Sequence, residues 1–369
     1  MTRARAFLFL LAWAPPLGTA AAQAAGTVAR TGVFFESYTF GSGLAFDRLS
    51  EMTIPVTVVQ RFGSHVTVDV GTAYASASVG QANGRTIEHT GFTDTDVRAA
   101  VAVVPGRLIF TVVGSLPTGA SAVPDTTIPL FGATGTDLLG FTTAGFGSGG
   151  GLSAGFASAF RVGQNWAVGT GASYRYAPTY TPVEGGDELT PGGEARLRVG
   201  MEGPFGGGNY FRGAFVYTAS GANEFDTGVR SLLGDRALTY GAVTLPLGRG
   251  SLGIYAWNMR RFSPRNADTS AIVVPRGNVL AAGVRLDRPL SPKVTLSPLL
   301  EFRHELTGPG AKMEFLGYLV RTGTDLRFRA GEQATLVVQA HLAVGTIQDE
   351  GERISLVGPR LGALIEWSR

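Results

Sequence analysis

The chain has 369 residues, a formal net charge of +3, no cysteine and 53 glycines. The missing cysteines exclude a disulfide framework, thiolate catalysis and Fe–S clusters. A net charge this close to zero argues against a nucleic-acid partner, which would need a strongly basic face.

The first segment has the features of a secretory signal peptide. Arg3 and Arg5 form a basic start, residues 6–14 form an apolar core, and small residues follow. This core is too short for a membrane-spanning helix, which needs about 20 apolar residues. We therefore predict that residues 1–22, or the chain up to Ala24, are cleaved; the alternative is an uncleaved N-terminal anchor. Cleavage would lower the net charge from +3 to +1, because the segment carries two arginines and no acidic residue (3 − 2 = 1).

The remainder, residues 23–369, alternates short turns with longer connections. The short turns, rich in glycine, proline, serine and asparagine, recur about every 40 to 45 residues, with one longer gap. A propeller blade has a similar period but fits four short strands into it. Here each period holds two long strands, which suits a tilted membrane crossing of about 9–11 residues with some overhang. We predict an all-β fold, a transmembrane antiparallel up-and-down β-barrel, in preference to a propeller.

Sixteen strands are predicted, and fourteen is the alternative because the first, tenth and eleventh alternate poorly. An even number places both termini at the short-turn end, which is periplasmic in bacterial barrels. The predicted strands are 28–40, 52–62, 65–79, 93–105, 107–118, 149–162, 165–178, 190–202, 209–220, 236–247, 251–262, 277–289, 293–306, 314–329, 333–346 and 353–368.

Alternation within the strands predicts which side chains face inward. In residues 293–306, Leu300 and Phe302 fall on one face while Glu301 and Arg303 fall on the other. A charge facing lipid at the bilayer midplane costs about 2–4 kcal/mol, so the charged faces must enclose an aqueous or protein-filled interior. The predicted lumen-lining residues are Asp94, Asp96, Arg98, Arg161, Glu194, Arg196, Arg198, Arg285, Asp287, Glu301, Arg303, Arg321, Asp325 and Arg327.

These interior charges have both signs. Arg285 and Asp287 lie on the strand next to Glu301 and Arg303, and opposite charges on neighbouring strands stabilise a sheet. One interpretation is a neutralised wall that holds the barrel in shape. The other is a transverse field with an excess of arginine that favours anionic permeants.

The connection 119–149 is the exceptionally long one. Loops longer than about 12–15 residues are usually functional or disordered. This loop is rich in apolar side chains that would be poorly placed in water, so we predict that it folds into the lumen as a constriction; the alternative is a flexible external loop. The residues predicted for the constriction are Asp125, Leu130, Phe131, Asp137, Leu139 and Phe141.

Two segments resemble a known family of outer-membrane barrels. Residues 91–119 (GFTDTDVRAAVAVVPGRLIFTVVGSLPTG) and 149–176 (GGGLSAGFASAFRVGQNWAVGTGASYRY) are similar to the meta-pathway phenol-degradation proteins, which are related to the long-chain fatty-acid transporters. The resemblance implies passive uptake of small hydrophobic or aromatic compounds. It also implies insertion into outer-membrane lipid by the barrel-assembly machinery.

Catalytic patterns are weak in this chain. Of the four histidines, alternation points His304 to lipid and His341 to the lumen, whereas His65 falls in a turn and His89 in an external loop. No metal-ligand spacing accompanies them. We therefore expect no enzyme, metal or cofactor, but an outer-membrane channel for small hydrophobic, aromatic or anionic permeants. The alternatives are a non-conducting structural or assembly barrel and, more weakly, an outer-membrane hydrolase.

Overall fold

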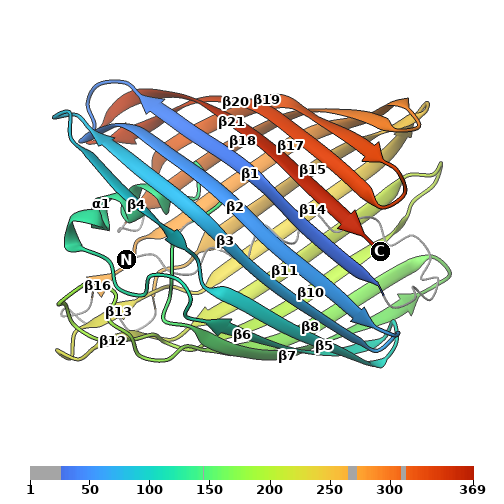
Figure 1. The fold of residues 1–369 in the computed structure, drawn as a ribbon, viewed down its shortest axis with the longest axis horizontal. Coiled ribbons are helices and arrows are strands. Elements are labelled where there is room, and N and C mark those ends of the chain that lie inside the picture. Colours follow the sequence, from blue (N-terminus) through green and yellow to red (C-terminus); the bar gives the residue numbers. More distant parts are fainter. Residues whose placement is uncertain (1–25, 144, 265–271, 309–312) are drawn as a thin grey trace.

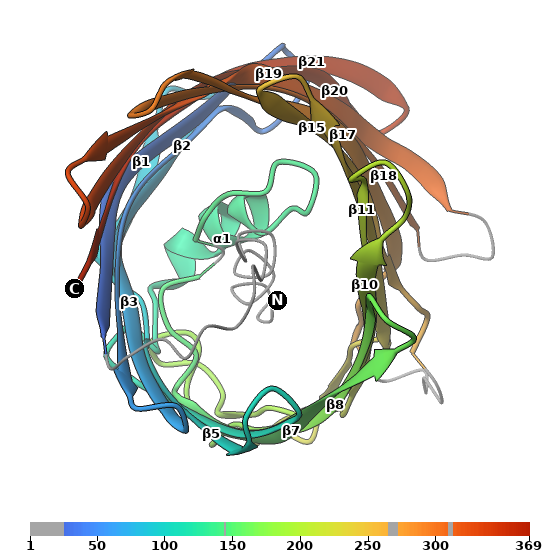
Figure 2. The ribbon, with the colours of Figure 1, turned by 90° about the vertical axis from the view of Figure 1, so that its right-hand side faces the viewer.

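The computed structural model describes residues 26–143, 145–264, 272–308 and 313–369, which form one antiparallel β-barrel (Figures 1 and 2). The predicted signal peptide, residues 1–22, lies outside the described residues.

Hairpins in chain order build the barrel wall. Its strands are β1 (Thr27–Phe40), β2 (Phe46–Phe62), β3 (Val66–Gln81), β4 (Thr86–Phe92), β5 (Thr95–Val104), β6 (Leu108–Leu116), β7 (Gly151–Val162), β8 (Trp166–Tyr176), β10 (Glu194–Pro204), β11 (Tyr210–Ser220), β14 (Arg236–Leu247), β15 (Gly250–Arg261), β17 (Arg276–Ser291), β18 (Val294–Gly308), β19 (Glu314–Ala330), β20 (Ala334–Asp349) and β21 (Glu352–Ser368). A separate small sheet at one end contains β9 (Leu189–Thr190), β12 (Asn223–Phe225), β13 (Arg230–Leu232) and β16 (Ile272–Val273). The helical elements are η1 (Asp125–Thr127) and α1 (Ile128–Thr134).

The barrel closes because the last strand pairs with the first, with Thr31 opposite Ile365. Strands β4 and β5 pair with successive parts of β3, so the 17 hydrogen-bonded strands of the sheet occupy sixteen positions around the wall. The predicted sixteen-stranded antiparallel barrel is confirmed, and the alternative of fourteen is wrong. Alternation is poor in β1 because its inward Tyr38 and Phe40 are also apolar and buried, packed inside the barrel.

Short turns gather at one end of the barrel, where glycines adopt the left-handed backbone conformation that other residues rarely adopt. Gly63 has φ 64°, and Gly106, Gly163 and Gly331 have φ 71°, 62° and 78°. The N–H of Thr27 donates to the carbonyl of Arg369 at 3.1 Å, so β1 begins and β21 ends at this short-turn end.

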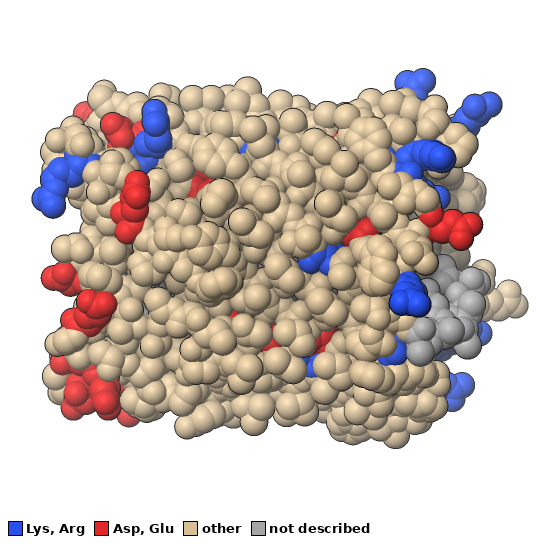
Figure 3. All heavy atoms as spheres, in the orientation of Figure 1, with Lys and Arg blue, Asp and Glu red and all other residues tan. Residues whose placement is uncertain are grey.

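The two faces of the wall differ as the alternation predicts. On β18, Leu300 and Phe302 are 50% and 42% exposed on the outside, whereas Glu301 and Arg303 are 7% and 5% exposed. Figure 3 shows charged side chains gathered at the two ends of the barrel, with a largely uncharged band between them. An apolar band around a closed barrel matches the hydrocarbon layer of a membrane. Among the described residues, no helix is both long and apolar enough to cross a membrane.

The structure differs from the predicted elements around Asp94. The predicted strand 93–105 begins earlier, because β4 already pairs with β3 from Thr86, and the wall is interrupted between Phe92 and Thr95. His89, predicted to lie in an external loop, is therefore a strand residue. The interruption follows from Asp94, whose carboxylate binds backbone N–H groups of the long loop.

Candidate functional site

The long loop 119–149 lies inside the barrel. Figure 2, a view along the barrel axis, shows α1 within the ring of strands. The side chains of Leu130 and Leu139 are 0% and 3% exposed and belong to one apolar cluster with inward residues of β1, β2 and β19 to β21. The barrel core is therefore the contact between this loop and the inner wall.

Asp94 fastens both ends of the loop to the wall. Its carboxylate accepts hydrogen bonds from the Gly119 N–H at 3.2 Å and from the Ser148 N–H at 2.7 Å. The Ser148 hydroxyl donates to the same carboxylate at 2.8 Å. A single side chain thus holds the two ends of the loop close together.

Two arginines of the wall bind the middle of the loop. Arg303 Nη1 on β18 donates to the Leu138 carbonyl at 3.4 Å, and Arg321 Nη2 on β19 donates to the Leu139 carbonyl at 3.3 Å. Next to this carbonyl, Gly140 has φ +68°, which turns the chain back along the wall. Charged donors make stronger hydrogen bonds than neutral ones, so these contacts hold the loop firmly.

Further along the loop, Thr143 is held by an acidic residue of β2. The Thr143 N–H donates to Glu51 at 2.9 Å, and Thr53 Oγ1 donates to the same carboxylate at 2.7 Å. Phe141 packs edge-on against Tyr38, with ring centroids 5.4 Å apart. Apolar packing and polar contacts therefore alternate along this segment.

Of the remaining predicted constriction residues, two contact the barrel wall and one is exposed. Asp137 lies 3.6 Å from Arg261 of β15 in an ion pair. Phe131 packs against the ring of His89, with centroids 5.4 Å apart, which is a loop contact that the sequence does not reveal. Asp125 is exposed on η1.

The arginines that hold the loop belong to a buried charge network on β1, β18 and β19. Arg321 lies 3.0 Å from Glu36 and 3.8 Å from Glu301, and Arg303 lies 2.8 Å from Glu301. Arg360 of β21 lies 3.6 Å from Glu36. Each charge has an opposite partner, which burial requires.

A second network continues from the first along the same wall. Arg285 lies 2.9 Å from both Asp287 and Asp325, and His341 Nε2 lies 2.9 Å from Asp325. Ser297 donates to Asp287 at 2.6 Å. Six of the predicted lumen residues, those on β17 to β19 above the short-turn end, therefore come together as a neutralised wall.

The other predicted lumen residues are spread over β5, β7, β10 and the short-turn end of β19. Asp96 accepts a hydrogen bond from Ser115, and Arg98 pairs with Asp69 at 2.6 Å. Glu194 pairs with Arg236 at 2.8 Å. Arg161 is exposed near the short-turn end of β7. Arg327 lines a separate small hollow at the same end of the barrel, next to Lys293 and Arg329.

A row of three arginines lies on β8 and β10. Arg196 and Arg198 share the inward face of β10, since Leu197 and Val199 between and beside them are exposed on the outside. Arg175 of β8 lies one strand away, opposite Glu194. Among the described residues, none of these three guanidiniums forms an ion pair, and Glu194 pairs with Arg236 instead.

Several site residues were not predicted from the sequence, namely Glu36, Tyr38, Glu51 and Tyr255. Tyr255 donates to Glu301 at 2.6 Å and completes the first network. The signal that the sequence carries for two of them lies in β1, where Glu36 and Tyr38 occupy alternate positions directly after the apolar residues Val33, Phe34 and Phe35.

The histidines lie apart from one another. His304 faces outward, where its ring stacks beside Phe302 with centroids 6.4 Å apart. His341 faces inward, as alternation predicts, and His65 lies in a turn beside Ser64. In the part of the chain that the structure describes, no group of three or more histidine, aspartate or glutamate residues is arranged to hold a metal ion.

Comparison with known proteins gives distant likenesses only. No protein-family model matches the chain, and no curated protein matches it in sequence. The resemblance to the meta-pathway phenol-degradation proteins therefore stays a prediction.

Solved structures of similar shape are outer-membrane barrels. OprB of Pseudomonas putida is 10% identical, with 93% of this chain and 94% of that chain covered and a TM-score of 0.46. The outer-membrane channel DcaP of Acinetobacter baumannii is 10% identical, with 94% and 98% covered and a TM-score of 0.44. OmpT of Vibrio cholerae is 13% identical, with 94% and 99% covered and a TM-score of 0.44. At such values, the description of this chain as a closed antiparallel barrel rests on its own strand pairing and surface.

Proposed function

We propose that the protein is an outer-membrane channel through which small molecules diffuse passively, and that loop 119–149 sets the width of the passage. The observation that carries this proposal is the attachment of the loop to the inner wall. Arg303, Arg321 and Asp94 bind its backbone at several points. A loop held in one position inside a barrel gives a passage of defined shape, which is how a diffusion channel selects by size.

The lumen has apolar side chains on one side and arginines on the other. These two surfaces favour permeants that combine an apolar part with a negative charge. The loop and its cluster supply apolar surface, including the exposed side chain of Ile128. The arginine row Arg175, Arg196 and Arg198 supplies positive charge on β8 and β10, which lie away from β1 to β3 in Figure 2. An aromatic or aliphatic carboxylate would contact both surfaces. The resemblance of residues 91–119 and 149–176 to barrels for phenolic compounds points in the same direction.

One observation favours a second candidate, a structural barrel that does not conduct. The loop buries Leu130, Leu138 and Phe141 against the wall, at 0%, 1% and 5% exposure. A loop packed this tightly could fill the lumen rather than narrow it.

Single-channel conductance in planar bilayers separates the two candidates. We expect the refolded protein to conduct, and a variant with residues 120–148 replaced by a short Gly-Ser linker to conduct more. A short linker can replace the loop because the loop ends are already close together: Gly119 and Ser148 both bind the Asp94 carboxylate. Conductance by neither protein would contradict the channel and favour the structural barrel. Conductance by the loop variant alone would make the loop a closed plug.

A further inference from the structure

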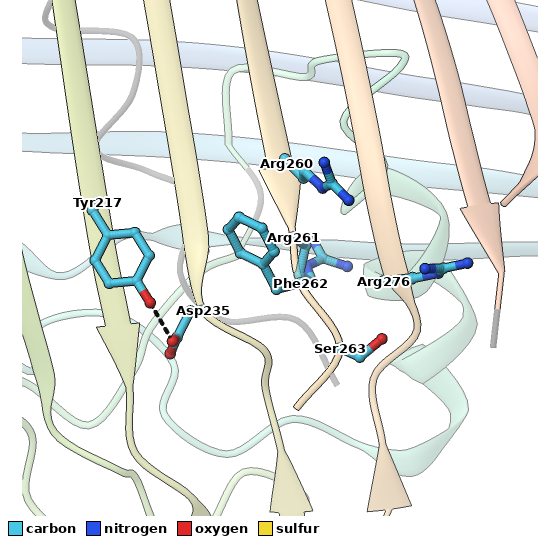
Figure 4. Close-up of a pocket in the computed structure, with 7 residues that line it drawn as sticks. All are labelled: Tyr217, Asp235, Arg260, Arg261, Phe262, Ser263 and Arg276. Carbon is cyan, nitrogen blue, oxygen red and sulfur yellow. Dashed lines mark hydrogen bonds between the residues drawn. The ribbon is translucent and has the colours of Figure 1, made fainter. Parts of the chain in front are cut away.

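A cavity of about 530 Å³ lies at the long-loop end of the barrel, between β11, β14, β15 and β17 (Figure 4). This volume is within the range of small-molecule sites, about 300–1,000 Å³. Figure 4 shows Tyr217 and Asp235 on one side, Arg276 on the other, and Arg260 with Phe262 between them. The lining residues are Tyr217, Asp235, Arg260, Arg261, Phe262, Ser263 and Arg276.

Strand alternation places the two outer arginines of this cavity on the outside of the barrel. Arg260 is six residues beyond Ile254, which is 43% exposed on the outer face of β15. Arg276 is four residues before Leu280, which is 43% exposed on the outer face of β17. Side chains an even number of residues apart on a strand share a face. The guanidiniums of Arg260 and Arg276 therefore point away from the lumen, whereas Arg261 turns inward to Asp137.

Neither outer arginine is neutralised by a residue that the structure describes. Within the described residues, Arg260 and Arg276 form no ion pair, and Arg260 lies over the ring of Phe262 at 5.2 Å from its centroid. The Nε atom of Arg276 is buried and has no hydrogen-bond partner in the part of the chain that the structure describes. Among the described residues that line the cavity, Asp235 is the one carboxylate, and it accepts hydrogen bonds from the Tyr217 hydroxyl and from the Ser220 N–H at 3.2 Å.

The height of these arginines relative to the membrane limits what can bind them. An outward arginine costs about 2–4 kcal/mol at the midplane of the bilayer and about 0–1 kcal/mol near the interface. Ile254, Leu280 and Val284 continue the outer faces of the same two strands toward the band, and all are apolar and exposed. A molecule in the cavity thus meets two cations at headgroup height, then Asn258 and Asn278, which are hydrogen-bonded to each other at 2.8 Å, and apolar surface beyond them.

We propose that this cavity binds a phosphate group of a lipid headgroup in the outer leaflet, with its acyl chains along Ile254, Leu280 and Val284. The planar guanidinium group matches phosphate oxygens with two parallel hydrogen bonds. The apolar surface below the arginines favours a lipid over a free phosphate ion, because only a lipid uses both. The placement in the outer leaflet rests on the proposed outer-membrane orientation, in which the long loops face outward.

Lipid binding by the refolded full chain in neutral detergent tests this proposal, read by native mass spectrometry. The probes are bisphosphorylated lipid A, the same lipid without its phosphates, and inorganic phosphate as competitor. We expect the phosphorylated lipid to bind most tightly and inorganic phosphate to displace it poorly. The variants Arg260→Gln and Arg276→Gln should each weaken binding about tenfold, since a hydrogen bond to a charged group contributes about that factor.

The matched control is Arg249→Gln, an exposed arginine in the turn at the other end of the β14–β15 hairpin. This variant should bind as the parent does. Equal binding of both lipids, or unchanged binding by the Arg260→Gln/Arg276→Gln double variant, would overturn the proposal. Full displacement by inorganic phosphate would also overturn it in favour of an ion site. Conductance should be the same in the double variant, which separates a failure of this site from a failure of the channel.

Discussion

Arg321 Nη2 donates a hydrogen bond to the carbonyl oxygen of Leu139 at 3.3 Å, across 182 positions of sequence. The same nitrogen lies 3.0 Å from Glu36 Oε1, so one guanidinium joins the loop to β1 and β19. The loop is held by a wall that is itself stabilised by the same charges. Barrel stability and the width of the passage are therefore linked through this residue.

Replacing Arg321 by methionine should destabilise the barrel by about 3–5 kcal/mol, because Glu36 would keep only Arg360 at 3.6 Å and Glu301 would lose one of its two arginine partners while both stay buried. Denaturation by guanidinium chloride in detergent micelles measures this change. The control Arg329→Met, at the exposed end of the same strand, should have little effect. The double variant Glu36→Gln/Arg321→Met should recover part of the loss. Equal stability of the Arg321→Met and Arg329→Met variants would show that the network contributes nothing.

Two glycines of the loop give a matched pair of alanine substitutions. A Cβ on Gly140 would lie 2.2 Å from Arg303 Nη1, and the φ of +68° is unfavourable for alanine. Gly140→Ala should therefore break the contact of Arg303 with Leu138 and increase the fluctuations of single-channel current.

A Cβ on Gly132, in α1, meets no atom within 4 Å. Gly132→Ala should leave the current trace unchanged, and the helix should gain up to about 1 kcal/mol. Similar traces from the two variants would mean that the contact of Arg303 does not hold the loop in place.

The arginine row predicts a preference for anions. Replacing Arg196 and Arg198 together by glutamine should move the anion-to-cation permeability ratio toward one, since both guanidiniums lack acidic partners within the described residues. Zero-current potentials across a salt gradient measure this ratio. Arg260→Gln, which removes an arginine from the outer face, should not change the ratio. If the two proteins gave equal potentials, the row would have no part in selection.

The apolar band predicts where an added charge is tolerated. Leu300→Arg, in the middle of β18, should destabilise the inserted barrel by about 2–4 kcal/mol. Leu290→Arg, at the end of β17 beside the short turn, should cost about 0–1 kcal/mol, although Leu290 is similarly exposed at 56%. Unfolding titrations in lipid vesicles compare them. Equal destabilisation by the two variants would show that the outer surface around Leu300 does not contact the hydrocarbon layer of a bilayer.

The amino-acid sequence by itself determined the barrel and the orientation of its side chains. The period of two in segments such as 293–306 fixes which residues share a face, and a residue such as Glu301 cannot face hydrocarbon. Glycines at Gly63, Gly106 and Gly331 mark the short turns, because their backbone conformation is local. These features depend on neighbours in the chain and can therefore be predicted from it.

Only the tertiary structure decided what the lumen contains. The same alternation predicts that Arg196 and Arg321 face inward, yet Arg196 forms no ion pair with a described residue and Arg321 contacts both Glu36 and Leu139. Their partners come from strands and a loop that are distant in sequence. The closure of the barrel sets those distances, and strand periodicity carries no information about them.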